Sequence, residues 1–136
     1  MKRLQTTILI ALSLILFTNG AIAQNKPLAC QTEAAGGLAW VNKQWVTSSF
    51  KEIKFILAQS GKTLTKDSVA NALRGNPEQV TCRNANSFIE CTDTSGGGFF
   101  FNQQTLKGAV SQLLGSAFST DVRDTVTVHI FSCTYF

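Results

Sequence analysis

The segment from residue 81 to residue 92 (TCRNANSFIECT) constrains the fold more than any other, because a turn at its middle brings two cysteines together. Three pairs of side chains that are favourable across antiparallel strands then face each other. These pairs are Cys82 with Cys91, Arg83 with Glu90, and Thr81 with Thr92. At the 82/91 position the strands approach to a Cα separation of about 4.5 Å, which a disulfide can bridge. The segment therefore predicts a hairpin closed by a Cys82–Cys91 disulfide.

The other two of the four cysteines, Cys30 and Cys133, are then expected to pair with each other. A zinc site is the alternative, but the cysteines are separated by 52, 9 and 42 positions and the chain has one histidine. Lipidation of Cys30 is a second alternative; Pro27 departs from the lipidation motif, and an odd number of cysteines would remain. We therefore expect two disulfides, no metal site and no cofactor.

The first 23 residues are typical of a secretory signal peptide. Lys2 and Arg3 supply its positive start, residues 8–17 its apolar stretch, and residues 21–23 a cleavage motif before Gln24. The apolar stretch is shorter than the roughly 20 residues that span a bilayer. We expect a periplasmic or secreted protein in which residues 24–136 form one domain, with no membrane anchor after cleavage.

The charge of this domain argues against nucleic acid as a partner. Loss of Lys2 and Arg3 lowers the net charge from +4 to +2. Proteins that bind nucleic acid concentrate basic residues in a patch or stripe. A net charge of +2 does not indicate such a patch.

Short runs of alternating polarity between turn residues predict a mainly-β domain at the margin of α+β. We expect a small antiparallel sandwich or barrel with one short helix and two disulfides. The helix should begin at Thr65 or Asp67 and end at Gly75, with its apolar side on the sheet. Residues 105–116 fit a strand or a helix, and we favour a strand because Gly108 weakens the helix.

Residues 125–135 form the clearest strand pattern. Val126, Val128 and Ile130 alternate with Thr127 and His129. This alternation predicts that the valines and the isoleucine face the core and that His129 faces solvent.

Three aromatic residues are candidates for ligand binding. Trp40 and Trp45 face each other across an expected hairpin that turns at 42–43, and either form a stacking platform or fill the core. Phe100 lies on the opposite face of a strand from Phe99 and Phe101. It is either covered by a second layer or exposed as a contact for a partner.

Catalysis finds less support than binding. His129 is the single histidine, and Glu90 or Glu52 would have to complete an acid–base pair with it, although their spacing does not select them. We therefore expect an exported non-catalytic module that binds a small apolar ligand or a protein. The alternatives are an inhibitor or immunity-like protein against an exported hydrolase, and a small hydrolase that uses His129.

Overall fold

The computed structural model describes residues 25–113 and 124–136. The expected signal peptide and the last part of the ambiguous segment, residues 114–116, lie outside the described residues. The strands are β1 (Leu28–Val41), β2 (Gln44–Ser49), β3 (Lys54–Leu57), β4 (Gln59–Ser60), β5 (Thr63–Leu64), β6 (Thr81–Ala85), β7 (Phe88–Thr92), β8 (Gly97–Asn102), β9 (Lys107–Gln112) and β10 (Thr125–Tyr135). Helix α1 (Lys66–Leu73) and the short 3₁₀ helix η1 (Pro77–Gln79) follow β5.

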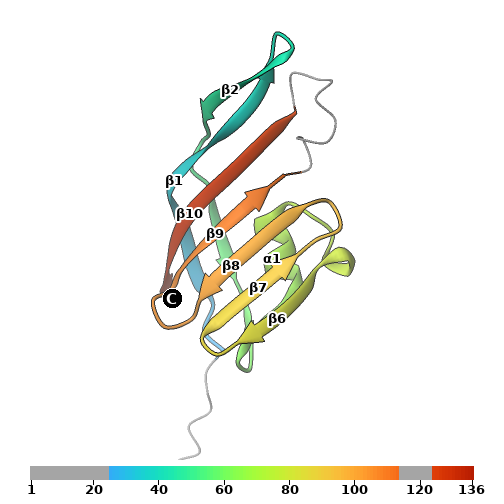
Figure 1. Ribbon diagram of the computed structural model, residues 1–136. Helices are drawn as coiled ribbons and strands as arrows, with labels where there is room; N and C mark the ends of the chain where they lie inside the picture. Colours follow the sequence, from blue (N-terminus) through green and yellow to red (C-terminus); the bar gives the residue numbers. More distant parts are fainter. Residues whose placement is uncertain (1–24, 114–123) are drawn as a thin grey trace, which may run out of the picture.

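All but the short β4–β5 pair belong to one antiparallel sheet, in the order β2-β1-β10-β9-β8-β7-β6 (Figure 1). The long strand β1 pairs with β10 along most of its length. On its other side it pairs with β3 at residues 28–31 and with β2 at residues 36–41. The expected mainly-β antiparallel fold with one short helix is confirmed.

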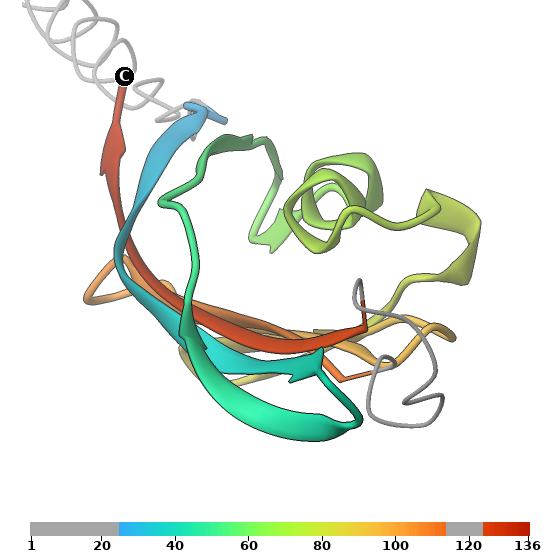
Figure 2. The same ribbon diagram turned by 90° about the horizontal axis from the view of Figure 1, so that it is seen from above.

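The sheet is strongly curved, and α1 lies on its inner side (Figure 2). We call this side the concave face and the other side the convex face. Phe99, Phe101 and Phe131 point to the concave face and are at most 1% exposed. Val69, Ala70, Ala72 and Leu73 of α1 are buried in the same core. Burial of these apolar groups is the main stabilising contribution to a domain of this size.

Helix α1 begins and ends where its capping residues predict. The Thr65 hydroxyl accepts a hydrogen bond from the Ser68 N–H, and Arg74 follows the last turn in a left-handed conformation with a φ of 56°. At eight residues, α1 depends on the sheet for its stability. No helix in the described parts of the chain is long and apolar enough to cross a membrane.

Both expected disulfides are present. The hairpin disulfide, Cys82–Cys91, joins β6 to β7 in the predicted register. The closing disulfide, Cys30–Cys133, joins β1 to β10 across 103 positions of sequence. The described residues contain no free cysteine. The two bonds are consistent with an oxidising compartment.

The ambiguous segment forms strand β9 over Lys107–Gln112, as we favoured. Gly108 has a packing role in it, because a Cβ at this position would overlap the Phe131 ring and the Phe100 carbonyl oxygen. The close approach of Phe131 to the β9 backbone therefore requires glycine here.

Candidate binding surface

Strand β10 has its polarity reversed relative to the sequence expectation. Thr127 and His129 lie on the concave face and are 8% and 9% exposed, whereas Val128 and Ile130 lie on the convex face and are 40% and 42% exposed. The expectations of a solvent-facing His129 and of core positions for Val128 and Ile130 were wrong.

The reason for the reversal lies at the end of the strand. Phe131 is fully buried among the rings of Phe55, Phe99 and Phe101, and Cys133 is held by the closing disulfide. Because side chains alternate with a period of two, these residues also turn His129 and Thr127 inward. A shift of one position would return the valine and the isoleucine to the core, but it would expose Phe131 and break the disulfide.

The residues that β10 turns outward join other apolar residues across the sheet. Ile130 pairs with Ala34 on one side and Ala109 on the other, and Ala109 pairs in turn with Phe100. Paired residues lie on the same face, so this row crosses four strands of the convex face. We call five of the large exposed apolar side chains of this face, on β1, β7, β8 and β10, the convex patch. They are Leu38, Phe88, Phe100, Val128 and Ile130.

Phe100 is the most exposed phenylalanine of this patch, at 45%. Its ring centroid lies 5.2 Å from that of Phe88, so the two rings form one aromatic surface on β7 and β8. The exposed alternative for Phe100 is therefore the one found, and no described element covers it. Beside the Phe100 ring, where Gly98 has no side chain, the surface has a shallow pocket of about 170 Å³.

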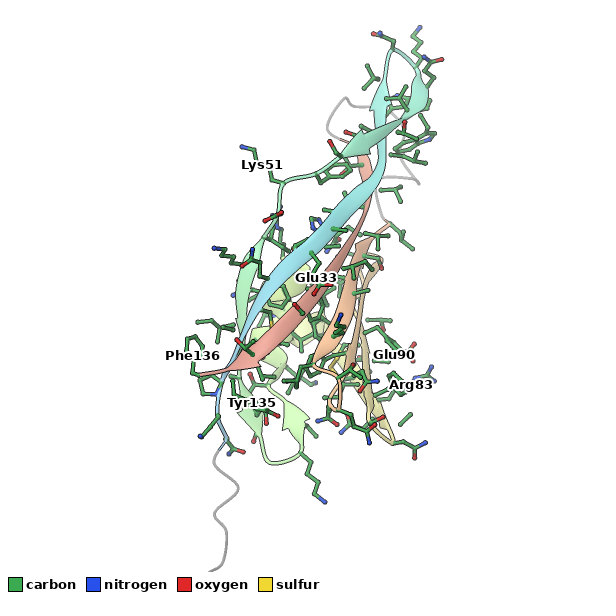
Figure 3. All side chains as sticks on the ribbon, turned by 90° about the vertical axis from the view of Figure 1, so that its left-hand side faces the viewer. Glu33, Lys51, Arg83, Glu90, Tyr135 and Phe136 are labelled. Atoms are coloured by element: carbon green, nitrogen blue, oxygen red, sulfur yellow. A yellow bond between two sulfur atoms is a disulfide. The ribbon has the colours of Figure 1, made fainter. Side chains whose placement is uncertain are left out.

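Paired charges border the convex patch. On one side, the Arg83 guanidinium contacts the Glu90 carboxylate at 2.6 Å (Figure 3). On the other, the Lys107 ammonium lies 3.9 Å from a carboxylate oxygen of Glu33. These pairs are exposed, so each contributes little to stability. An apolar centre with a charged rim is the usual anatomy of a protein–protein interface.

Trp40 and Trp45 extend this face to the tip of the β1–β2 hairpin. They are direct cross-strand partners, with ring centroids 5.3 Å apart in an edge-to-face arrangement. The turn between them has φ values of 51° at Asn42 and 65° at Lys43, as a two-residue hairpin turn demands. Both rings are half-buried. By strand alternation they project to the same side as Leu38, outside the core of the described residues.

His129 is separated from Glu90, one of the two acidic residues considered as its partner. Glu90 pairs with Arg83 on the convex face, whereas His129 is buried on the concave face, so the sheet lies between the two. Burial lowers the pKa of His129 below its ordinary value of 6.5, and the nearby Arg74 charge lowers it further. Its Nδ1 atom is buried and has no hydrogen-bond partner among the described residues. The neutral imidazole is the form this environment favours.

Glu52 lines an open groove beside β3, together with Lys54 and Glu33. The groove holds about 860 Å³, and its lining includes polar residues of β1 and β10. The described residues contain no cluster of three or more side chains of the types that bind a metal ion.

The glycine run at 96–98 is a structural element organised by Asp93. One carboxylate oxygen of Asp93 accepts hydrogen bonds from the Ser95 N–H at 2.9 Å and the Gly97 N–H at 2.7 Å. A Cβ on Gly97 would lie 2.7 Å from the other oxygen. The turn into β8 therefore needs a glycine beside this carboxylate.

Phe100 and the tryptophan pair were predicted from the sequence as binding residues, whereas Phe88, Leu38, Val128 and Ile130 were not. A usable signal was present in β10: if Cys133 forms a buried disulfide, every second residue before it also points inward.

Comparison of the chain with protein-family models, with curated proteins and with solved structures found no match.

Proposed function

We propose that this chain is an exported, non-catalytic interaction module that binds a protein partner through the convex face of its sheet. The observation that carries the proposal is the reversed polarity of β10, which places Val128 and Ile130 at the surface beside Phe100. Exposed apolar side chains that form one patch mark interaction sites more often than isolated ones do.

The composition of the face supports a protein partner. Aromatic residues are enriched at interfaces and carry much of their binding energy, and this face presents Phe88, Phe100 and the Trp40–Trp45 pair. The charges at its rim are already paired with each other, so a partner can cover the apolar centre without burying an unpaired charge.

Export is the part of the proposal that depends on residues 1–23, whose sequence is typical of a signal peptide. The hairpin disulfide and the closing disulfide agree with a destination outside the reducing cytosol. The mass of the protein recovered from producing cells tests the start at Gln24.

Site-specific photocrosslinking in the producing cells tests the convex face. A photoreactive phenylalanine analogue replaces Phe100 in one variant and Asn71, an exposed residue of α1, in a control variant. We expect a discrete adduct from position 100 and none from position 71. Phe88→Ser should weaken the adduct, because it removes the neighbouring ring from the patch.

Equal adducts from positions 100 and 71, or none from position 100, would contradict the proposal. Native mass spectrometry separates a small apolar ligand from a protein partner. Extra mass of a few hundred daltons that disappears on denaturation would favour the small ligand over the protein.

A further inference from the structure

The outer edge of β2 carries backbone groups that no other described strand pairs with. The hairpin turn makes Val41 and Gln44 the first hydrogen-bonded pair, so hydrogen bonding to β1 alternates from there along β2. The N–H and C=O groups of Trp45, Thr47 and Ser49 consequently point away from β1. The Trp40 N–H agrees with this pattern, because it donates a hydrogen bond to the backbone carbonyl oxygen of Asp124, on the side of β1 away from β2.

This edge lacks the features that usually block strand addition. Strand β2 (QWVTSS) contains no charged residue and no proline, and its register with β1 has no bulge. The opposite edge strand, β6, carries Arg83, and β3 carries Lys54. Among the edges of the described sheet, the β2 edge is therefore the one best suited to accept another strand.

A lysine stands at each end of the β2 edge. Lys43 lies in the turn before β2 and Lys51 follows the strand, eight positions later. Both are exposed, and neither belongs to an ion pair between described residues. Figure 3 shows Lys51 projecting away from the sheet. An added strand would thus meet a positive charge at both ends.

These lysines oppose pairing with a second copy of the chain. The antiparallel register that pairs Thr47 with Thr47 of the second copy satisfies the outward groups of both strands. In that register Lys43 of each copy lies opposite Lys51 of the other, so like charges meet at both ends. The same two charges favour a strand that carries acidic residues at its ends.

We propose that β2 accepts, as an added antiparallel strand, an extended segment of the partner protein with one acidic residue at each end and uncharged residues between them. This inference rests on the proposed function and names the mode of docking. The two acidic residues are eight positions apart, to match Lys43 and Lys51. Every second residue between them projects beside Trp45 on the convex face and is apolar.

Titration with synthetic peptides tests the inference, with the fluorescence of the two tryptophans as the signal. The probe is the capped peptide ETVTVTVTE, and KTVTVTVTK is its matched control. We expect the acidic peptide to bind at least tenfold more tightly than the lysine peptide. The double variant Lys43→Glu/Lys51→Glu should reverse this order.

Thr47→Pro tests the backbone contact, because it removes an outward N–H without removing a hydrogen bond between β1 and β2. Thr47→Ala is its control, since it loses the side chain and keeps the N–H. We expect at least a tenfold loss of affinity for the proline variant and a small change for the alanine variant. Retention of both disulfides and of the thermal midpoint checks that each variant folds.

Equal binding of the two peptides, or unchanged binding to the charge-reversed protein, would overturn the inference. Absence of binding at millimolar peptide, together with a specific crosslink from position 100, would reject strand addition and leave the proposed function standing. Absence of both would reject the two together.

Discussion

Three consecutive phenylalanines on β8 should differ sharply in their contribution to stability. Phe99 and Phe101 are each 1% exposed, and their rings lie 5.7 and 6.1 Å from that of Phe131. Truncating a buried phenylalanine to alanine costs about 3–5 kcal/mol. We therefore expect Phe99→Ala and Phe101→Ala each to lower the free energy of unfolding by that amount.

Phe100→Ala should cost much less. The side chain is 45% exposed, so only about half of the roughly 1.5–3 kcal/mol for full burial of a phenylalanine is lost, which is about 1 kcal/mol. Its main packing partner in the patch is the Phe88 ring. The three variants have the same chemical change in one strand, so their difference measures the burial of each site.

Urea unfolding followed by circular dichroism measures these losses. With a slope of about 1–3 kcal/mol/M, the midpoint should fall by at least about 1 M for the two buried positions and by at most about 1 M for Phe100. Phe99→Leu replaces Phe99→Ala if the alanine variant does not fold. A Phe100→Ala variant as destabilised as Phe99→Ala would show that position 100 is buried, and would refute the convex patch.

Three further predictions concern stability. From loop lengths of 103 and 9 residues, the chain-entropy relation gives about 4.7 kcal/mol for the closing disulfide and about 2.6 kcal/mol for the hairpin disulfide. Replacing both cysteines of one disulfide by alanine should therefore lower the free energy of unfolding, measured with denaturant, more for the closing disulfide than for the hairpin disulfide. The opposite order would contradict this prediction. Burial and the Arg74 charge lower the pKa of His129 in the folded protein, so below pH 6.5 unfolding is accompanied by uptake of a proton at this residue. The free energy of unfolding should therefore rise as the pH approaches 6.5 from below and level off above it. His129→Gln should remove that part of the pH profile, and an unchanged profile would show that His129 is not its source. Gly37→Ala should lower the thermal midpoint by several degrees, because its Cβ would overlap the Val126 carbonyl oxygen; an unchanged midpoint would show that the strands can separate there.

Local patterns predicted the elements of this fold well. The register of the hairpin at 81–92 could be predicted from its own residues, since one turn position places all three favourable pairs opposite each other. Thr65, the N-cap of α1, was one of the two capping residues expected, Thr65 or Asp67, before an apolar stretch. The cross-strand pairing of Trp40 with Trp45 followed from the expected turn at 42–43, where both residues adopt positive φ. In each case the deciding interactions lie within about ten residues of each other.

The candidate surface was only partly predictable for the same reason. Phe100 could be assigned to the opposite face from its neighbours, but whether a second layer covers it depends on where α1 packs. Helix α1 packs on the concave face, so Phe100 stays exposed. The role of the lysines that flank β2 could not be predicted, because it depends on the position of β2 at the edge of the sheet.

The sequence by itself determined the alternation of side chains along each strand, the hairpin pairings and the hairpin disulfide, because these depend on a period of two and on neighbouring residues. The closing disulfide then followed by elimination, since Cys30 and Cys133 were the two cysteines that remained. Tertiary structure alone decided which of the two faces of β10 is inside. Alternation is equally consistent with either choice, and the greater hydrophobicity of Val128 and Ile130 favoured the wrong one. Burial of Phe131 against three other rings, together with a disulfide to a strand 103 positions away, outweighed that preference and left the valine and the isoleucine at the surface.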